Sequence, residues 1–278
     1  MRFERVLVVG AGQMGAGIAQ VLAASGRSVL LHDAAPGAVD KGLATMRKSL
    51  EKLAAKGADH DPDEVLGRVE PVDDLGEADL MVEAVVEDSA VKQEIFGRAD
   101  AALPAGAVLA SNTSSIPIAS LAAATSRPDR VVGMHFFNPV PVMALVEVVR
   151  APGTSEETVG GIVELSRELG KTPAEVNDFP GFVSNRVLMP FINEAAYALQ
   201  DGVAEAEAID TIARLGFNHP MGPLALADLI GLDTCVSIME VLRDGLGDAK
   251  YEPCPLLRRH VEAGRLGRKT GVGFYDYL

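Results

Sequence analysis

The chain has 278 residues, of which 48% are hydrophobic and 23% are charged, so it is long enough for one or two domains and too apolar to be disordered. Its formal net charge of −14 argues against nucleic acid and anionic membranes as main partners, because both repel a negative surface. Two cysteines are too few for a disulfide framework, and no apolar run reaches the ~20 residues of a membrane-spanning helix. We therefore expect a cytoplasmic protein.

The first half of the chain alternates short apolar segments with longer helical patterns. The expected strands are Arg5–Val9, Ser28–His32, Arg68–Val72, Leu80–Val86, Val108–Ser111, Val131–Met134 and Leu145–Val149. The expected helices between them are Gln13–Ser25, Gly37–Lys56, Val91–Leu103 and Ile116–Ala124. This alternation predicts an α/β fold with a parallel, doubly wound sheet and helices on both of its faces.

After about residue 153 the strand signal ends and the pattern becomes helical. Helices are expected at Ser155–Leu169, Phe182–Gln200, Ala204–Leu215, Leu224–Leu242 and Leu256–Ala263. The segment from Asn177 to Gly181 contains a Pro-Gly pair and is typical of a turn. We therefore place a domain boundary near residue 180, with an α/β domain over residues 1–180 and an all-α domain over residues 181–278.

A G-x-G-x-x-G motif lies between the first strand and the first helix. Its residues are Gly10, Ala11, Gly12, Gln13, Met14 and Gly15. Such glycines allow a tight turn and a close approach of pyrophosphate, and the helix N-terminus donates N–H groups to the phosphates. The next strand ends at Asp33, 21 residues after Gly12, where a carboxylate would bind ribose hydroxyls and repel a 2′-phosphate. The motif predicts NAD binding in preference to NADP; for Asp33 alone, an ordinary strand-end carboxylate is the alternative.

Polar residues follow two other expected strands. Glu87 and Lys92 come after the strand that begins at Leu80, close to where a nicotinamide ribose would lie, unless they are solvated loop charges. A run of small polar residues over 111–115, which includes Ser114, follows the next strand. It either binds a substrate oxygen or caps the helix expected from Ile116.

One histidine and one glutamate are candidates for acid–base chemistry. His135 ends an expected strand, and Glu147 follows 12 residues later inside an apolar run, where a carboxylate is costly unless it is paired. A turn through Pro139–Pro141 would fold Glu147 back onto His135, which would orient the ring and stabilise its protonated form. The alternative is a satisfied core histidine beside a strand-edge glutamate. The sequence contains no cluster with the spacing of metal ligands, so no metal is expected.

Six segments, which span nearly the whole chain, carry a family resemblance. They read VVGAGQMGAGIAQVLA, SNTSSIPI, GMHFFNPVPVMALVEVV, DFPGFVSNRVLMPFINEA, HPMGPLALADLIGLD and GRKTGVGFYDY. The most specific is HFFNP, followed by the glutamate twelve residues after its histidine. The chain resembles the short-chain L-3-hydroxyacyl-CoA dehydrogenases, closest to the bacterial 3-hydroxybutyryl-CoA dehydrogenases.

The resemblance implies a Rossmann-type NAD domain followed by a helical domain for substrate binding and dimerisation. It also implies residue roles: His135 is the catalytic base, Glu147 its partner, and Asn138 part of their network and of the cofactor site. Ser114 and Asn185 contact substrate oxygens, and the two domains would close over the site. Ser114, Glu87 and Lys92 match residues on the cofactor side.

Two further expectations concern the coenzyme A tail and the homodimer. The phosphates of the tail need cations, and Lys48, Lys52 and Lys56 share one face of the expected helix Gly37–Lys56, unless that face is merely solvated. Apolar stripes that include Ile192, Ala196 and Leu229 fit a dimer interface or, alternatively, the core of the second domain.

The expected activity is the interconversion of a (3S)-3-hydroxyacyl-CoA, of short chain length, and the 3-ketoacyl-CoA with NAD(H), in fatty-acid or related metabolism. Two alternatives stay open. One is a sugar-acid dehydrogenase of the same superfamily, such as an L-gulonate 3-dehydrogenase. The other is a non-catalytic NAD-binding protein. The sequence leaves acyl-chain preference, direction and pathway undetermined.

Overall fold

The computed structural model describes residues 1–277 of the chain. These residues form two compact units, of which the first is Met1–Phe179 and the second begins at Pro180. No helix in the described part of the chain is long and apolar enough to cross a membrane.

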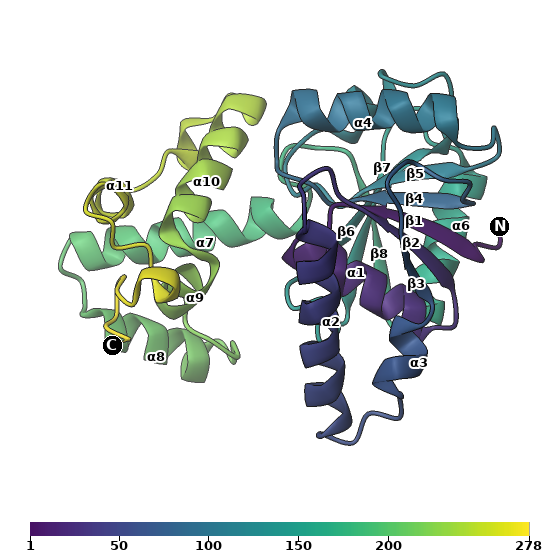
Figure 1. Ribbon diagram of the computed structural model, residues 1–278. Helices are drawn as coiled ribbons and strands as arrows, with labels where there is room; N and C mark the ends of the chain where they lie inside the picture. Colours follow the sequence, from purple (N-terminus) through teal and green to yellow (C-terminus); the bar gives the residue numbers. More distant parts are fainter. Residues whose placement is uncertain (278) are drawn as a thin grey trace. The chain divides into compact units, whose positions relative to one another are not determined.

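Within residues 1–277, the first unit contains one eight-stranded sheet in the order β3-β2-β1-β4-β5-β6-β7-β8 (Figure 1). The strands are β1 (Arg5–Val9), β2 (Ser28–His32), β3 (Val69–Pro71), β4 (Leu80–Glu83), β5 (Val108–Ser111), β6 (Val131–Phe136), β7 (Leu145–Arg150) and β8 (Thr172–Asn177). Neighbouring strands are parallel, except that β7 runs antiparallel to β6. The order 3-2-1-4-5-6 is that of a doubly wound Rossmann-type sheet, which confirms the predicted fold class.

Helices cover both faces of this sheet. They are α1 (Gln13–Ala24), α2 (Ala38–Ala54), α3 (Pro62–Leu66), α4 (Ser89–Ala102), α5 (Ile118–Ala122) and α6 (Glu156–Glu168), with a 3-10 helix η1 (Pro128–Arg130). Apolar side chains of α1, α2 and α6 pack in one core with alternate residues of the strands, whereas α4 lies on the opposite face (Figure 1). Side-chain caps fix where two helices begin: Asp88 accepts a hydrogen bond from Val91 N in α4, and Ser155 accepts one from Thr158 N in α6.

The absence of strands after residue 153 was a wrong prediction, because β8 completes the sheet. Its sequence, TPAEVN, contains a proline and a charged residue, and its burial pattern is mixed. Such a strand is tolerated because β8 pairs with β7 alone, so Pro173, which lacks an N–H, interrupts no central ladder. The strand expected at Leu80–Val86 ends earlier, at Glu83.

The second unit is helical, as predicted. Its helices are α7 (Ser184–Gln200), α8 (Ala206–Gly216), α9 (Pro223–Ile230), α10 (Leu232–Leu246) and α11 (Pro255–Glu262), with 3-10 helices η2 (Ala249–Tyr251) and η3 (Arg268–Thr270). The single helix expected at Leu224–Leu242 is two helices, because Gly231 adopts a φ of 105°, which no α-helix accommodates. Ile192 and Ala196 lie in the core of this unit, packed with residues of α9, α10 and α11.

Candidate active site

The paired strands β6 and β7 bring His135 and Glu147 together. The two residues are directly opposite in the antiparallel register, and His135 Nδ1 lies 2.8 Å from Glu147 Oε2. Both side chains are buried, and the ring of Phe137 lies 4.7 Å from the imidazole. A carboxylate in this apolar strand is therefore satisfied by a partner, as the turn after β6 suggested. A histidine held by a carboxylate in this way can act as an oriented acid or base.

The glycine-rich loop after β1 has the geometry that the motif predicts. Gly10 has a φ of 103°, and a Cβ there would lie 2.6 Å from the carbonyl oxygen of Ala84. A Cβ on Gly15 would lie 1.7 Å from the carbonyl oxygen of Gly10, so α1 approaches the loop too closely for any side chain. Around Gly12, which precedes the first turn of α1, a Cβ would meet nothing within 4 Å. The loop is thus tight on two sides and open at the helix N-terminus, where an anion would bind.

Asp33 and Asn138 lie next to this loop. Asp33 follows β2, and its carboxylate accepts hydrogen bonds from Ala11 N at 2.7 Å and Ala35 N at 2.9 Å. Gln13 Nε2 donates to Asn138 Oδ1 at 3.1 Å, which connects the start of α1 to the segment after β6. Met14 is partly buried in the same first turn.

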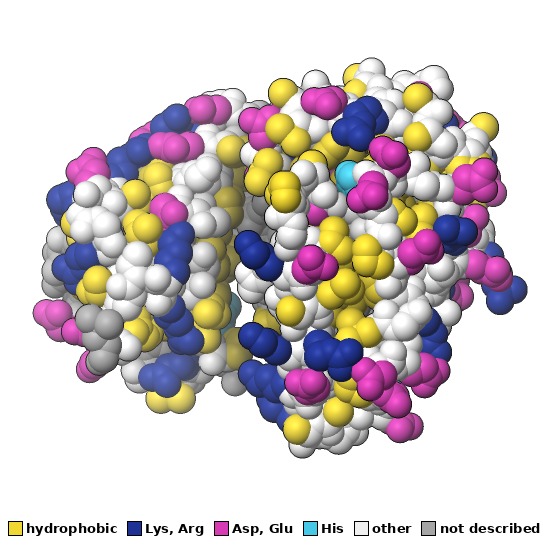
Figure 2. Space-filling view, viewed as in Figure 1, with side chains coloured by type: hydrophobic (Ala, Val, Ile, Leu, Met, Phe, Trp, Pro, Cys, Tyr) yellow, Lys and Arg dark blue, Asp and Glu magenta, His cyan; other side chains and the backbone are white. Residues whose placement is uncertain are grey.

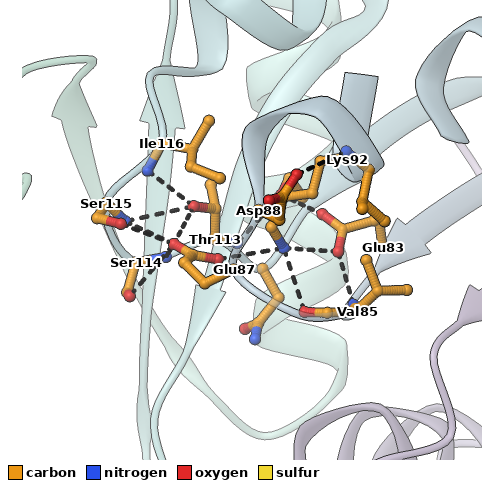
Figure 3. A network of polar contacts seen from close by, with 12 residues as sticks. Glu83, Val85, Glu87, Asp88, Lys92, Thr113, Ser114, Ser115 and Ile116 are labelled. Atoms are coloured by element: carbon orange, nitrogen blue, oxygen red, sulfur yellow. Dashed lines mark hydrogen bonds and ion pairs between the residues drawn. The ribbon is translucent and has the colours of Figure 1, made fainter. Parts of the chain in front are cut away.

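Glu87 organises the polar segment after β5 (Figure 3). Its Oε1 accepts hydrogen bonds from the Thr113 hydroxyl at 2.5 Å and from the backbone N–H groups of Ser114 and Ser115, both at 3.0 Å. Its Oε2 lies 3.2 Å from Lys92 Nζ. Burial alone would raise the pKa of Glu87, but the Lys92 ammonium and these donors outweigh that effect and hold the pKa below its usual range. Glu87 is therefore an ionised anchor for the segment that contains Ser114.

The alternative that Lys92 is a solvated loop charge is wrong. Lys92 is 1% exposed, and its ammonium lies 2.6 Å from Oε1 of Glu83, a carboxylate with no exposure at all. Glu83 was not among the predicted site residues. The signal was present in the sequence, since Glu83 ends an otherwise apolar strand, but its partner lies nine residues away on α4.

The polar segment after β5 does not cap the helix that follows it. α5 begins at Ile118, and its first N–H groups, those of Ile118 and Ala119, are bound by the carboxylate of Asp178. The hydroxyl of Thr113 instead accepts hydrogen bonds from the N–H of Ile116 and, at 3.3 Å, from that of Ser115, and so tightens the loop. The segment therefore does not cap α5 itself, although Thr113 binds the N–H of Ile116, the residue at which that helix was expected to begin.

Three predicted lysines lie on or near α2, and one of them is placed differently from the prediction. Lys48 and Lys52 are exposed on the helix, one turn apart, whereas Lys56 lies beyond its end. The helix stops because Gly57, with a φ of 92°, closes its C-terminus by donating its N–H to Ala54 O. Figure 2 shows basic side chains gathered over the part of the first unit where α2 runs.

Asn185 lies in the second unit, in the first turn of α7, and its side chain is buried. Among residues 1–277, no group of three or more His, Cys, Asp or Glu side chains is arranged to hold a metal ion.

Two family models match the chain over almost its whole length. The model described as 3-hydroxyacyl-CoA dehydrogenase, NAD binding domain, matches residues 5–179, and the model of the C-terminal domain of the same enzymes matches residues 181–277. The chain belongs to the 3-hydroxyacyl-CoA dehydrogenase family.

Named relatives agree with this assignment. A 3-hydroxybutyryl-CoA dehydrogenase of Bradyrhizobium diazoefficiens is 50% identical over 99% of this chain and 95% of its own length. One of Clostridioides difficile is 48% identical over 98% of this chain and 99% of its own length. The crystal structure of (S)-3-hydroxybutyryl-CoA dehydrogenase from Ralstonia eutropha has a TM-score of 0.95 and 48% identity, and the match covers all of both chains.

As a 3-hydroxyacyl-CoA dehydrogenase, the protein is an NAD-dependent oxidoreductase, and its first unit contains the NAD-binding domain. The loop residues fit that cofactor, because the space around Gly12 and the α1 N-terminus suits a pyrophosphate while Gly10 and Gly15 leave no room for side chains.

Proposed function

We propose that this 3-hydroxyacyl-CoA dehydrogenase interconverts (3S)-3-hydroxybutyryl-CoA and acetoacetyl-CoA, with His135 as acid–base and Glu147 as its partner. The observation that carries the proposal is the 2.8 Å contact between His135 Nδ1 and Glu147 Oε2 in a chain of this family. The preference for a four-carbon substrate is inferred from the names of relatives 50% and 48% identical to this chain.

The pairing with Glu147 determines which atom of His135 moves a proton. Because Nδ1 faces a carboxylate, it is the donor nitrogen, and Nε2 is left as the acceptor. In oxidation, Nε2 takes the proton of the 3-hydroxyl group, and Glu147 stabilises the imidazolium that forms. In reduction, the same imidazolium returns the proton to the 3-keto oxygen. NAD, when bound, supplies the hydride acceptor.

The residues around the glycine-rich loop would hold this cofactor. We assign the pyrophosphate to the loop formed by Gly10, Gly12, Gln13, Met14 and Gly15, with the N–H groups at the start of α1 as donors, and the adenosine ribose to Asp33. The fixed carboxylate of Asp33, which is already held by two backbone N–H groups, supports a preference for NAD over NADP. Glu87, Lys92, Asn138 and Ser114 are assigned to the nicotinamide side by family resemblance.

The remaining substrate contacts rest on the family pattern. We assign the oxygens of the substrate to Ser114 and Asn185. The coenzyme A phosphates are assigned to Lys48 and Lys52, which are exposed and, within residues 1–277, have no ion-pair partner. Lys56 stays a candidate only as a loop residue, since it does not share their helical face.

We further infer a homodimer formed through the second unit. The support is an exposed apolar group on and beside α8 and α9, which consists of Ile212, Leu215, Phe217 and Leu229. Leu215, at 81% exposure, is the most exposed of the four, and a group of exposed apolar side chains of this kind is typical of an interaction surface. The division at residue 180 into an NAD-binding part and a part for substrate binding and dimerisation is proposed with it. A cytoplasmic location and a place in fatty-acid metabolism stay predictions.

Steady-state rates with a set of substrates test the proposal. We expect the highest kcat/KM for acetoacetyl-CoA with NADH, lower values for longer 3-ketoacyl-CoA substrates, and much lower values with NADPH. L-gulonate with NAD serves as the comparison, because a sugar-acid dehydrogenase would not need the coenzyme A tail. Turnover of L-gulonate in preference to 3-hydroxybutyryl-CoA would refute the proposal, as would NADH binding without any turnover.

A further inference from the structure

A buried carboxylate lies behind the segment that contains Ser114. Glu83, at the end of β4, has no solvent exposure, and three groups bind it: Lys92 Nζ at 2.6 Å, Val85 N at 2.6 Å and the Ser111 hydroxyl at 2.6 Å. A buried ion pair of this kind is often no more stabilising than an apolar replacement. Its presence therefore calls for a reason other than stability.

Two chains of contacts lead from Glu83 to the same short segment, and the one through Lys92 and Glu87 can be followed in Figure 3. In the first chain, Glu83 binds Lys92, whose Nζ lies 3.2 Å from Glu87 Oε2. The other oxygen of Glu87, Oε1, accepts hydrogen bonds from residues 113–115. The second passes through Ser111, whose hydroxyl oxygen accepts a hydrogen bond from Thr113 N at 3.1 Å. Both chains end on the backbone beside Ser114.

We propose that Glu83 is a positioning residue for the substrate-binding segment 113–115. Its charge fixes the position of the Lys92 ammonium between the two carboxylates, 3.2 Å from Glu87 Oε2, and Glu87 in turn holds the backbone of Ser114 and Ser115. Glu83 itself touches neither substrate nor cofactor in this proposal. The inference rests on the proposed function, in that it takes Ser114 as a substrate-binding residue.

The charges explain why a carboxylate is needed at position 83. Lys92 is surrounded by protein, so its ammonium requires a paired anion, which Glu83 supplies at 2.6 Å. If Glu83 were neutral, Lys92 would depend on Glu87 alone and would be drawn toward it. Glu87 would then rearrange its contacts with residues 113–115, and the hydroxyl of Ser114 would move with the backbone.

A double-mutant cycle between Glu83 and Ser114 tests this coupling. Glu83→Gln keeps the size of the side chain and its capacity for hydrogen bonds, because the Ser111 hydroxyl can turn to accept from the new amide. We expect it to lower kcat/KM for acetoacetyl-CoA about tenfold, the scale of one weakened substrate hydrogen bond. In a Ser114→Ala background, the same change should cost less than about twofold. Glu94→Gln, which removes an exposed charge from the same helix as Lys92, is the matched control.

One further measurement and one further variant separate a positioning role from general damage to the fold. The Kd of NADH, measured by fluorescence, should stay within about twofold of the parent value in Glu83→Gln. If Glu83→Gln does not fold, Ser111→Ala replaces it, because that variant interrupts one chain of contacts and leaves the ion pair with Lys92 in place. Ser111→Ala should also lower kcat/KM for acetoacetyl-CoA in the parent protein and cost less than about twofold in the Ser114→Ala background.

Each outcome has a definite meaning. An equal loss from Glu83→Gln in both backgrounds, or a loss that appears wholly in the Kd of NADH, overturns the positioning role while the proposed function stands. If Ser114→Ala alone leaves kcat/KM unchanged, the substrate role of Ser114 is wrong, and the inference about Glu83 is overturned with it.

Discussion

The location of the proton on His135 decides whether its ring can act as a base. Glu147 lies against Nδ1, so the neutral ring carries its hydrogen there and presents Nε2 as the acceptor. The partner is supplied by the neighbouring strand and is itself buried, which keeps water from competing for the imidazole. A glutamate in the apolar run of β7 is therefore consistent with a functional pair.

Replacement of His135 tests this assignment. His135→Gln should lower kcat by about 10²–10⁴-fold, the usual contribution of an acid–base group, and should leave NADH binding nearly unchanged. Stopped-flow or steady-state rates with acetoacetyl-CoA provide the measurement, and His60→Gln, at an exposed histidine, is the control. Near-full activity in His135→Gln would exclude the proposed mechanism.

Glu87 binds the segment between β5 and α5 in its ionised form, so its contribution to the free energy of unfolding should depend on pH. Its folded pKa is lowered, because Lys92 and the donors of residues 113–115 outweigh the opposing effect of burial. A carboxyl group whose folded pKa is depressed stabilises the protein above its unfolded pKa of ~4.3, and this stabilisation disappears as pH falls through the folded pKa.

The corresponding variant is Glu87→Gln. We expect a lower free energy of unfolding than in the parent at pH 7, and a difference that shrinks as the pH is lowered from about 5 to about 3. Urea denaturation at a series of pH values measures both. A difference that is constant over this range would mean that the charge of Glu87 does not stabilise the fold.

Local sequence pattern was enough to predict the elements that are buried on both faces or begin with a clear motif. β1, β2 and β5 have the predicted bounds because each is a short apolar run, bounded at one end by glycine or a polar residue. β8 was missed because an edge strand need not be apolar, and the break at Gly231 was missed because α9 and α10 continue one apolar pattern.

Contacts between distant elements could not be predicted in the same way. The loop glycines, Asp33 and the His135–Glu147 pair follow from short-range spacing and the turn after β6. Glu83 acquires its importance only when the fold places Lys92 of α4 and Ser111 of β5 around it. A side chain whose partners come from two other elements has no local signature, apart from its cost in an apolar strand.

At the scale of the whole molecule, the exposed apolar group beside α8 and α9 leads to a prediction about assembly. Leu215→Glu places a charge where the proposed partner copy would bury a leucine, so it should convert the dimer into a monomer. Light scattering coupled to size-exclusion chromatography measures the mass. Glu205→Gln, an exposed change just before the same helix, should leave the assembly intact. A parent protein that is already monomeric would refute the proposed dimer.

The position of β8 also bears on how the first unit is completed during synthesis. β7, which contains Glu147, pairs with β8 on its outer side, so β7 is an open edge until residues 172–177 have left the ribosome. A fragment that stops before Thr172 should therefore aggregate, whereas one that ends after Asn177 contains all eight strands of this sheet. Once formed, β8 is the outermost strand, and its Pro173 and Glu175 discourage pairing with a foreign strand. Pro173 and Glu175 therefore have two effects: they weaken the strand signal of β8 in the sequence, and they disfavour edge-to-edge pairing of the folded sheet with another chain.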